Sequence, residues 1–194
     1  MAEREGVLQR GRRVFLREPR PEDQEEVIAL NRGSARHYGG WVSPPATPEQ
    51  FAAYVERCAR EDFEGLLVCR AADGAIMGTV NLSQIFRGPF QNAYVGYFIG
   101  APSAAQGYMT EALDLALRHA FRTLKLHRIE ANIQPENAAS IALVRKLGFR
   151  LEGFSPRYLK IGGRWRDHER WAILREEWEG RHGRGAARGG GAAR

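Results

Sequence analysis

Residues 96–153 read GYFIGAPSAAQGYMTEALDLALRHAFRTLKLHRIEANIQPENAASIALVRKLGFRLEG, and this stretch decides the fold. It begins with an apolar strand at 96–99, and a short loop containing Gly107 then opens a long helix. A second strand follows at 128–133, and a second helix begins at Asn137 and ends before Gly148. A unit of this order places the unpaired backbone amides of a helix N-terminus beside a strand edge, where an anionic ligand can bind.

The first helix of this unit has the clearest periodicity in the chain. Its apolar residues recur at the i, i+3, i+4, i+7 spacing of a one-sided helix over four turns. They are Met109, Ala112, Leu113, Ala116, Leu117, Ala120, Phe121 and Leu124.

The remaining pattern predicts strands and helices on both sides of this unit. We expect the order strand, two helices, three antiparallel strands, helix, strand, helix and two strands. The expected strands outside the unit are 13–17, 66–69, 76–85, 150–159 and 165–174, with helices at 22–30 and from 47, and a loop at 32–45. Two βα crossovers within a largely antiparallel order predict the α+β class, with a mixed, mainly antiparallel sheet flanked by helices.

The composition is that of one globular domain, with 43% hydrophobic and 27% charged residues among 194. No window is long and apolar enough to span a bilayer, so we expect no membrane partner. The first residues lack the basic and apolar regions of a secretory signal, which makes the cytoplasm the expected location. We expect the domain to occupy 1–180. The sequence does not decide between a monomer and a homodimer.

The net charge of +6 lies largely in the last residues. Residues 181–194 hold four arginines and no acid, and are otherwise mainly Gly and Ala. We expect this segment to be a disordered tail, because it has little to bury against the entropy of ordering. Such a tail can make weak RNA contacts by counterion release, although a solvated terminus is the simpler interpretation.

The two cysteines, Cys58 and Cys69, are too few for a disulfide framework and wrongly spaced for zinc. We interpret both as packing residues and expect no metal site.

Three segments carry candidate chemistry. Loop 101–110 can hold phosphate on backbone amides, with Gly107 for a close approach, or it can be a plain connection. In 135–140, Asn137 and Ser140 can cap the helix locally or face a ligand between the two strands. The aromatic and charged segment 158–168 fits packing and substrate binding equally well.

Taken together, these residues resemble the GNAT superfamily of acyl-CoA N-acyltransferases, and within it the RimJ type of ribosomal-protein alanine N-acetyltransferases. The resemblance covers about 14–178. The segments that carry it are 81–83, 87–90, 94–97, 107–112, 127–132, 135–140, 147–149, 152–153 and 163–168.

The resemblance implies a slot for the cosubstrate acetyl-CoA between the strand containing 97–99 and the strand 128–133, which splays away from it. The positions implied to bind it are Tyr97, Phe98, Ile99, Ala104, Ala105, Gln106, Gly107, Tyr108, Met109, Asn132, Asn137 and Ser140. One departure concerns Ala104, where the superfamily has Gln or Arg. The side-chain contact to phosphate is then missing, and we expect weaker cosubstrate binding.

The expected reaction is direct attack of an amine on the acetyl thioester, with Ser140 as the candidate to protonate the leaving thiolate. Position 94 is Tyr94, as in the RimJ type, where related enzymes often place a Glu. That difference favours an α-amine, with a pKa of about 7.7–8.0, over lysine at about 10.4. Tyr94, Glu152 and water are the candidate proton acceptors.

The resemblance therefore implies an acceptor at a protein N-terminus, such as that of a ribosomal protein. A small-molecule amine, for instance an antibiotic or an amino acid, remains an alternative acceptor. A non-catalytic ribosome- or RNA-binding module that uses the arginines at 164, 166 and 170 and the tail is the alternative of a different class.

Overall fold

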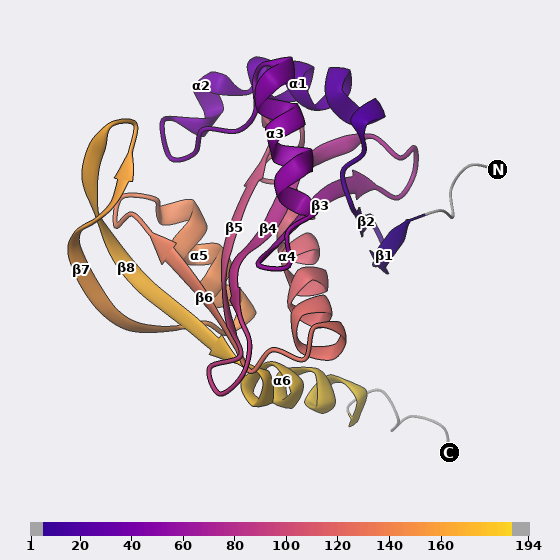
Figure 1. Ribbon diagram of the computed structural model, residues 1–194. Coiled ribbons are helices and arrows are strands. Elements are labelled where there is room, and N and C mark those ends of the chain that lie inside the picture. The colour runs from indigo at the N-terminus through magenta and orange to yellow at the C-terminus, as the bar shows by residue number, and fades with distance from the viewer. Residues whose placement is uncertain (1–5, 188–194) are drawn as a thin grey trace.

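The computed structural model describes residues 6–187 of the chain and folds them around one open sheet (Figure 1). The strands are β1 Val7–Arg10, β2 Val14–Arg17, β3 Phe63–Arg70, β4 Ile76–Phe86, β5 Asn92–Ile99, β6 Arg128–Ile133, β7 Arg150–Ile161 and β8 Arg164–Leu174. The α-helices are α1 Gln24–Gly33, α2 Ala35–Tyr38, α3 Pro48–Cys58, α4 Tyr108–Arg118, α5 Ala138–Leu147 and α6 Arg175–Ala187. Short 3₁₀ turns at Pro21–Asp23 and Ala101–Ser103 and a π-helical turn at His119–Thr123 complete the elements.

The sheet has the order β1-β2-β3-β4-β5-β6-β8-β7. The β5–β6 pair is parallel, and each of the other neighbouring pairs in this sheet is antiparallel. This confirms the expected α+β class with a mixed, mainly antiparallel sheet. The chain crosses from β5 to β6 through α4, and from β6 through α5 to the β7–β8 hairpin.

The sheet opens between β5 and β6. Their pairing runs from Asn92 opposite Arg128 to Tyr94 opposite Glu130. β5 continues to Ile99 and remains paired with β4 to its end, and β6 continues to Ile133 on β8. Figure 1 shows β6, β7 and β8 leaning away from β5 as they rise from this point. The expected splay of the two strands is therefore present.

Helices cover both faces of the sheet. One buried cluster packs α4, Val144 of α5 and Trp178 of α6 against the central strands. A second, smaller cluster packs Val27, Ile28 and Phe51 of α1 and α3 against Leu67 and Ile76. Burial of an apolar face on each side makes the arrangement stable in water, at about 25 cal/mol per Å² of apolar surface.

Local signals explain where α4 and α5 begin and end. Gly107 precedes α4 with φ +80°, a left-handed conformation that glycine adopts without a Cβ penalty. Asn137 caps α5, and its side chain accepts a hydrogen bond from the Ser140 backbone N–H at 3.1 Å. α5 ends at Gly148, also left-handed at φ +93°, and Phe149 returns to the core.

Three elements were not expected from the sequence: β1, α2 and α6. α2 lies inside the expected loop 32–45, and α6 extends to Ala187. The expected domain boundary at 180 therefore falls inside a helix, whose Arg181 guanidinium donates to the Lys146 carbonyl at 2.8 Å. Of the expected disordered tail, residues 188–194 lie outside the described part of the chain.

Candidate active site

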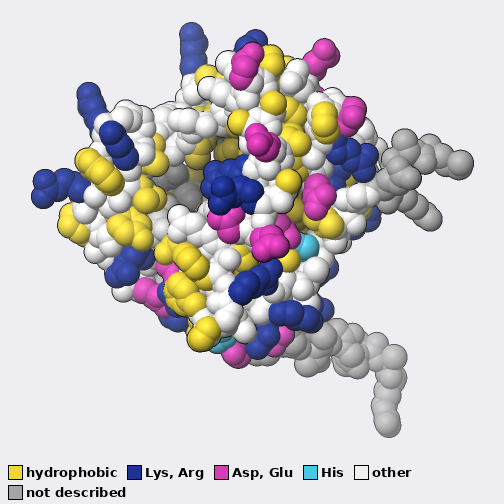
Figure 2. Space-filling view, in the orientation of Figure 1, with side chains coloured by type: hydrophobic (Ala, Val, Ile, Leu, Met, Phe, Trp, Pro, Cys, Tyr) yellow, Lys and Arg dark blue, Asp and Glu magenta, His cyan; other side chains and the backbone are white. Residues whose placement is uncertain are grey.

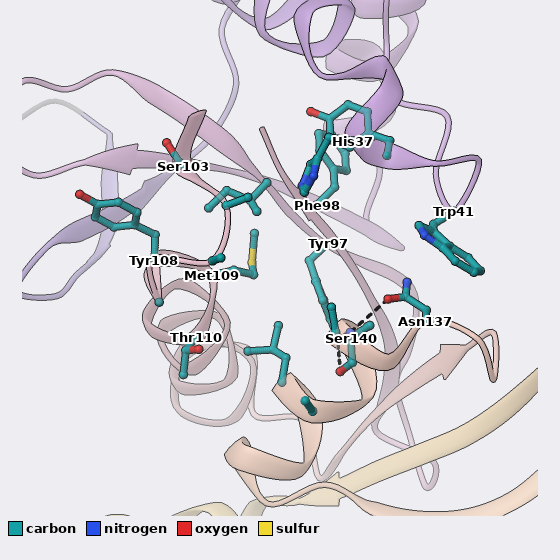
Figure 3. Close-up of a pocket in the computed structure, with 18 of the residues that line it drawn as sticks. His37, Trp41, Tyr97, Phe98, Ser103, Tyr108, Met109, Thr110, Asn137 and Ser140 are labelled. Atoms are coloured by element: carbon teal, nitrogen blue, oxygen red, sulfur yellow. Dashed lines mark hydrogen bonds between the residues drawn. The ribbon is translucent and has the colours of Figure 1, made fainter. Parts of the chain in front are cut away.

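A cavity of about 500 Å³ lies where β5 separates from β6. α2, the end of β5, the loop before α4 and the start of α5 surround it (Figure 3). In Figure 2 the surface is hollowed beside the part formed by β7 and β8. The lining residues are His37, Tyr38, Trp41, Val42, Tyr97, Phe98, Ile99, Ser103, Ala104, Ala105, Gly107, Tyr108, Met109, Thr110, Asn137, Ala139, Ser140, Ala142, Leu143 and Lys146.

Most of the cosubstrate positions implied by the resemblance meet in this cavity. Those that line it are Tyr97, Phe98, Ile99, Ala104, Ala105, Gly107, Tyr108, Met109, Asn137 and Ser140. Four candidates are not among the lining residues: Gln106, Asn132, Tyr94 and Glu152. Segments far apart in the sequence thus build one site.

The free edge of β5 presents backbone hydrogen-bonding groups to this site. In a strand, the N–H and C=O groups of successive residues point alternately to the two neighbouring strands. The Gly100 N–H donates to Met77 of β4, whereas the Gln91 carbonyl accepts from Arg128 of β6. By this alternation the backbone groups of Tyr97 and Ile99 face the open side. They are available to an extended amide-bearing ligand such as the pantetheine arm of acetyl-CoA.

The loop before α4 supplies an anion-binding end. The first N–H groups of an α-helix have no partner within the helix and carry about half a positive charge. Two left-handed residues, Ala105 at φ +57° and Gly107 at φ +80°, shape the turn that leads into the helix. A Cβ on Gly107 would meet only the Arg13 guanidinium, at 3.8 Å, so the loop surface there is open to a ligand. These features fit a pyrophosphate group.

Two cationic side chains flank this loop. Arg13, from the turn between β1 and β2, stacks over the Tyr108 ring at 4.0 Å and donates to the Gln106 carbonyl at 2.9 Å. Lys146, near the end of α5, lines the cavity from the other side. Both also line an adjoining cavity of about 470 Å³ that α6 borders through Arg181. The acids Glu111 and Asp114 line the same adjoining cavity. The two cations were not expected from the sequence, and a phosphate at the loop would lie near them, where Ala104 provides no polar side chain.

Ser140 is held in place from two sides (Figure 3). Its backbone N–H donates to the Asn137 side chain, and its hydroxyl lies 2.6 Å from the Tyr97 hydroxyl. Burial raises the pKa of Tyr97 to about 12, and the bond to Ser140 lowers it by a smaller amount. The phenol therefore stays protonated at neutral pH. This pair was missed in the sequence because its members lie on different elements, 43 residues apart.

Tyr94 and Asn132 lie on the strands that border the opening but outside the cavity. Burial, and then the carboxylate of Glu130, raises the pKa of Tyr94, so its hydroxyl is protonated at neutral pH and is a poor base. The neighbouring Tyr158 of β7 raises the pKa of Tyr94 by a smaller amount. Among the described residues, the Asn132 side-chain oxygen is buried without a hydrogen-bond partner.

Glu152 forms ion pairs with two arginines on β6 and β7. Its carboxylate accepts from Arg128, at 3.1 Å in one of two contacts, and from Arg150 at 2.7 Å. The hydrogen bond from Arg128 lowers the pKa of Glu152. A carboxylate that is stabilised in its ionised form is a weak base. Glu152 is also absent from the lining of the cavity, so the structure does not bring this candidate proton acceptor there.

α2 and the chain after it close the cavity opposite α5. Tyr38 packs edge-on against Phe98, with ring centroids 5.4 Å apart, and its hydroxyl donates to Asn31. His37 and Trp41 stand at the same side of the opening (Figure 3). The sequence signal for these residues was an aromatic and His-rich segment, which we interpreted only as a loop.

Elsewhere, the described residues show neither a reactive thiol nor a cluster of metal ligands. Burial raises the pKa of both Cys58 and Cys69 to about 11, so neither thiol is a nucleophile at neutral pH. Within residues 6–187, no group of three or more His, Cys, Asp or Glu is placed to hold a metal ion. No helix in the same range has the length and hydropathy needed to cross a membrane.

Comparison with known proteins agrees with this geometry. Residues 13–150 match the acetyltransferase (GNAT) domain family. The probable N-acetyltransferase YjcK of Bacillus subtilis is 34% identical over 178 residues, which span 88% of this chain and 98% of that protein. The [ribosomal protein uS5]-alanine N-acetyltransferase of Escherichia coli is 44% identical over 103 residues, which span 53% of each chain.

A solved structure carries the same fold with a CoA derivative bound. The Mycobacterium smegmatis RimJ in complex with CoA-disulfide superposes with a TM-score of 0.78 at 30% identity, over 84% of this chain and 83% of that chain. The splayed strands, the family match and this neighbour lead to one conclusion. The chain belongs to the GNAT acetyltransferase family and is an acetyl-CoA-dependent N-acetyltransferase.

Proposed function

We propose that this enzyme transfers the acetyl group of acetyl-CoA to the N-terminal α-amine of a protein, with the N-terminus of a ribosomal protein as the candidate acceptor. The observation that carries the proposal is the absence of any Asp or Glu among the residues that line the cavity, as far as the chain is described. Its titratable side chains other than tyrosine are His37 and Lys146.

A cavity without carboxylates suits an α-amine better than a lysine or a polyamine. An α-amino group has a pKa of about 7.7–8.0 and is roughly a tenth or more neutral at pH 7, whereas lysine, at about 10.4, is almost fully charged. A lysine or polyamine acceptor needs acidic groups to bind its cations and a base to deprotonate them. An α-amine can lose its proton to water. The uS5-alanine acetyltransferase relative supports the same acceptor class.

The residues of the cavity have separate roles in this reaction. The Ile99 N–H, on the free edge of β5, is the proposed donor to the carbonyl oxygen that gains charge in the transition state. The N-terminus of α4, with Arg13 and Lys146, would hold the phosphates. α2 and Trp41 would form the wall of the cavity along which the acceptor amine enters. Ser140 would stabilise the sulfur that leaves.

Intact-mass detection of acetyl transfer from acetyl-CoA to a panel of acceptors tests the proposal. The panel contains peptides with free N-terminal Ala, Ser or Met, one N-terminally blocked peptide with an internal Lys, and the small amine spermidine. We expect acetylation of the Ala peptide with the blocked peptide and spermidine untouched. Transfer to the Lys peptide or to spermidine alone, or to no peptide at all, would overturn the assignment.

A further inference from the structure

We propose that Tyr97 is a positioning residue that holds the Ser140 hydroxyl as a hydrogen-bond donor toward the leaving sulfur of the cosubstrate. The inference rests on the proposed function only for its turnover measurement. Tyr97 becomes a second residue at the thioester end of the site, where the sequence had suggested Ser140 alone.

The contact itself is short and lies at the cavity wall. The two hydroxyl oxygens are 2.6 Å apart, and both residues line the cavity. Tyr97 comes from β5 and Ser140 from the first turn of α5, so the contact bridges the two elements on either side of the opening. In Figure 3 the Tyr97 side chain points at Ser140.

The direction of this hydrogen bond decides what Ser140 can do. A serine hydroxyl has one proton to donate. If Ser140 donated this proton to Tyr97, the serine would have no proton left to donate to a ligand in the cavity. If the phenol donates to the Ser140 oxygen, the serine proton is free to point into the cavity. The phenol is the better donor of the two because a phenol is more acidic than an alcohol, and with a pKa of about 12 it is protonated at neutral pH. Donation to the serine also polarises its O–H bond, which strengthens the onward hydrogen bond.

The backbone of Ser140 is fixed by the helix cap, and its hydroxyl is held by the contact with Tyr97. Its N–H is held by the Asn137 cap at 3.1 Å, which fixes the first turn of α5. The Tyr97 ring is in turn packed against the main buried cluster. Both members of the pair therefore stand on positions that the fold itself holds.

In the transfer, the amine nitrogen forms a bond to the acetyl carbon, and the carbon–sulfur bond breaks with its electron pair on sulfur. The Ser140 hydroxyl donates a hydrogen bond to that sulfur as its negative charge develops. The proton lost by the amine goes to water, and Tyr97 keeps its own proton throughout. Tyr97 thus acts through Ser140 and does not touch the reacting atoms.

A titration of bound CoA tests the inference without any acceptor. The thiol pKa of CoA bound to the enzyme is measured from the ultraviolet absorbance of the thiolate, for the wild type, Tyr97→Phe, Ser140→Ala and the double variant. We expect the lowest pKa in the wild type, a rise of about half a unit in Tyr97→Phe and about one unit in Ser140→Ala. The double variant should match Ser140→Ala alone, because Tyr97 acts through that hydroxyl.

Turnover supplies the second readout. We expect Tyr97→Phe to lower kcat about fivefold with the KM for acetyl-CoA unchanged, and to have no further effect in the Ser140→Ala background. Tyr54→Phe is the matched control. It removes a half-buried phenol that donates to Asn81 at 2.8 Å, away from the cavity, and should change neither readout.

An unchanged thiol pKa in Tyr97→Phe, or additive effects of the two substitutions, would overturn the inference. If the wild type acetylates no peptide but the thiol pKa still shifts as expected, the proposed acceptor is wrong and the role of Tyr97 stands. The two failures are therefore distinguishable.

Discussion

Tyr94 and Glu130 form the last residue pair that joins β5 to β6, and the sheet is open from this pair onward. The cavity proposed to hold the cosubstrate lies beyond it. The strand edge that faces the opening, the amide end of α4 and the first turn of α5 converge there. A pairing that stops early is thus the structural basis of the site.

Replacing Ala104 with Gln should tighten cosubstrate binding. Ala104 lines the cavity at the loop before α4, and a longer amide side chain there adds a donor for phosphate. One added hydrogen bond corresponds to roughly three- to tenfold in affinity. Calorimetric titration with acetyl-CoA measures the change. Ala101→Gln, on an exposed residue of the same loop outside the cavity, is the control. Equal dissociation constants for the two variants would contradict the placement of the phosphates.

Replacing Asn137 with Ala should destabilise the fold by about 1 kcal/mol. The Asn137 side chain accepts from the Ser140 N–H, and its loss leaves the first turn of α5 uncapped. Chemical denaturation measures the free energy of unfolding. Asn137→Asp retains the acceptor and should recover most of the loss. If the Asp variant is as unstable as the Ala variant, the cap is not the reason for the effect.

Glu152 should contribute stability that depends on pH. The hydrogen bond from Arg128 lowers its folded pKa below the usual 4.5. Its stabilising effect is therefore complete above the unfolded pKa and is lost as the pH falls through the lower, folded value. Because the carboxylate is near the surface, we expect Glu152→Gln to cost about 1 kcal/mol or less at pH 7.

The check is the free energy of unfolding of both proteins from neutral pH to pH values well below 4.5. The difference between them should shrink as the medium becomes acidic. Glu56→Gln, on the exposed face of α3, is the control and should stay close to the wild type. A difference that is constant with pH would mean that the ion pairs contribute nothing through the charge of Glu152.

Trp178 should anchor α6 to the domain. Its side chain is 1% exposed, packs on Phe121 and donates to Asp114 at 2.9 Å. Trp178→Ala should lower the free energy of unfolding by about 3–5 kcal/mol, as large buried aromatics do. Trp165→Ala, at an exposed tryptophan of the β7–β8 hairpin, should cost far less. Equal losses in thermal or chemical denaturation would show that α6 is not part of the cooperative fold.

The sequence predicted the central part of this structure well. The apolar periodicity of 109–124 and the caps at Asn137 and Gly148 are local signals, and the structure confirms both helices. The α-helical part of the first ends at Arg118, and a π-helical turn continues it to Thr123. β5 and β6 were equally clear. The elements of this unit also contribute most of the cavity, so ten of the implied binding positions line it.

The residues that the sequence missed depend on tertiary contacts. α2 and Trp41 form a cavity wall through tertiary contacts such as the packing of Tyr38 on Phe98 of β5. Arg13 lies 95 positions from Tyr108 and reaches it through the β1–β2 turn. α6 contains several glycines, which disfavour a helix, and its Trp178 supplies the burial that overrides this propensity. None of these contacts has a signature in local spacing.

The most direct test of the account is where acetyl-CoA binds. Ala142 of α5 lines the cavity, whereas the neighbouring exposed Ala138 does not. Calorimetric titration with acetyl-CoA should show micromolar binding to the wild type and to Ala138→Trp. In Ala142→Trp the indole would fill the cavity, so binding should be weakened at least about tenfold or be absent. Unimpaired binding to a folded Ala142→Trp variant would contradict the assignment of this cavity as the acetyl-CoA site.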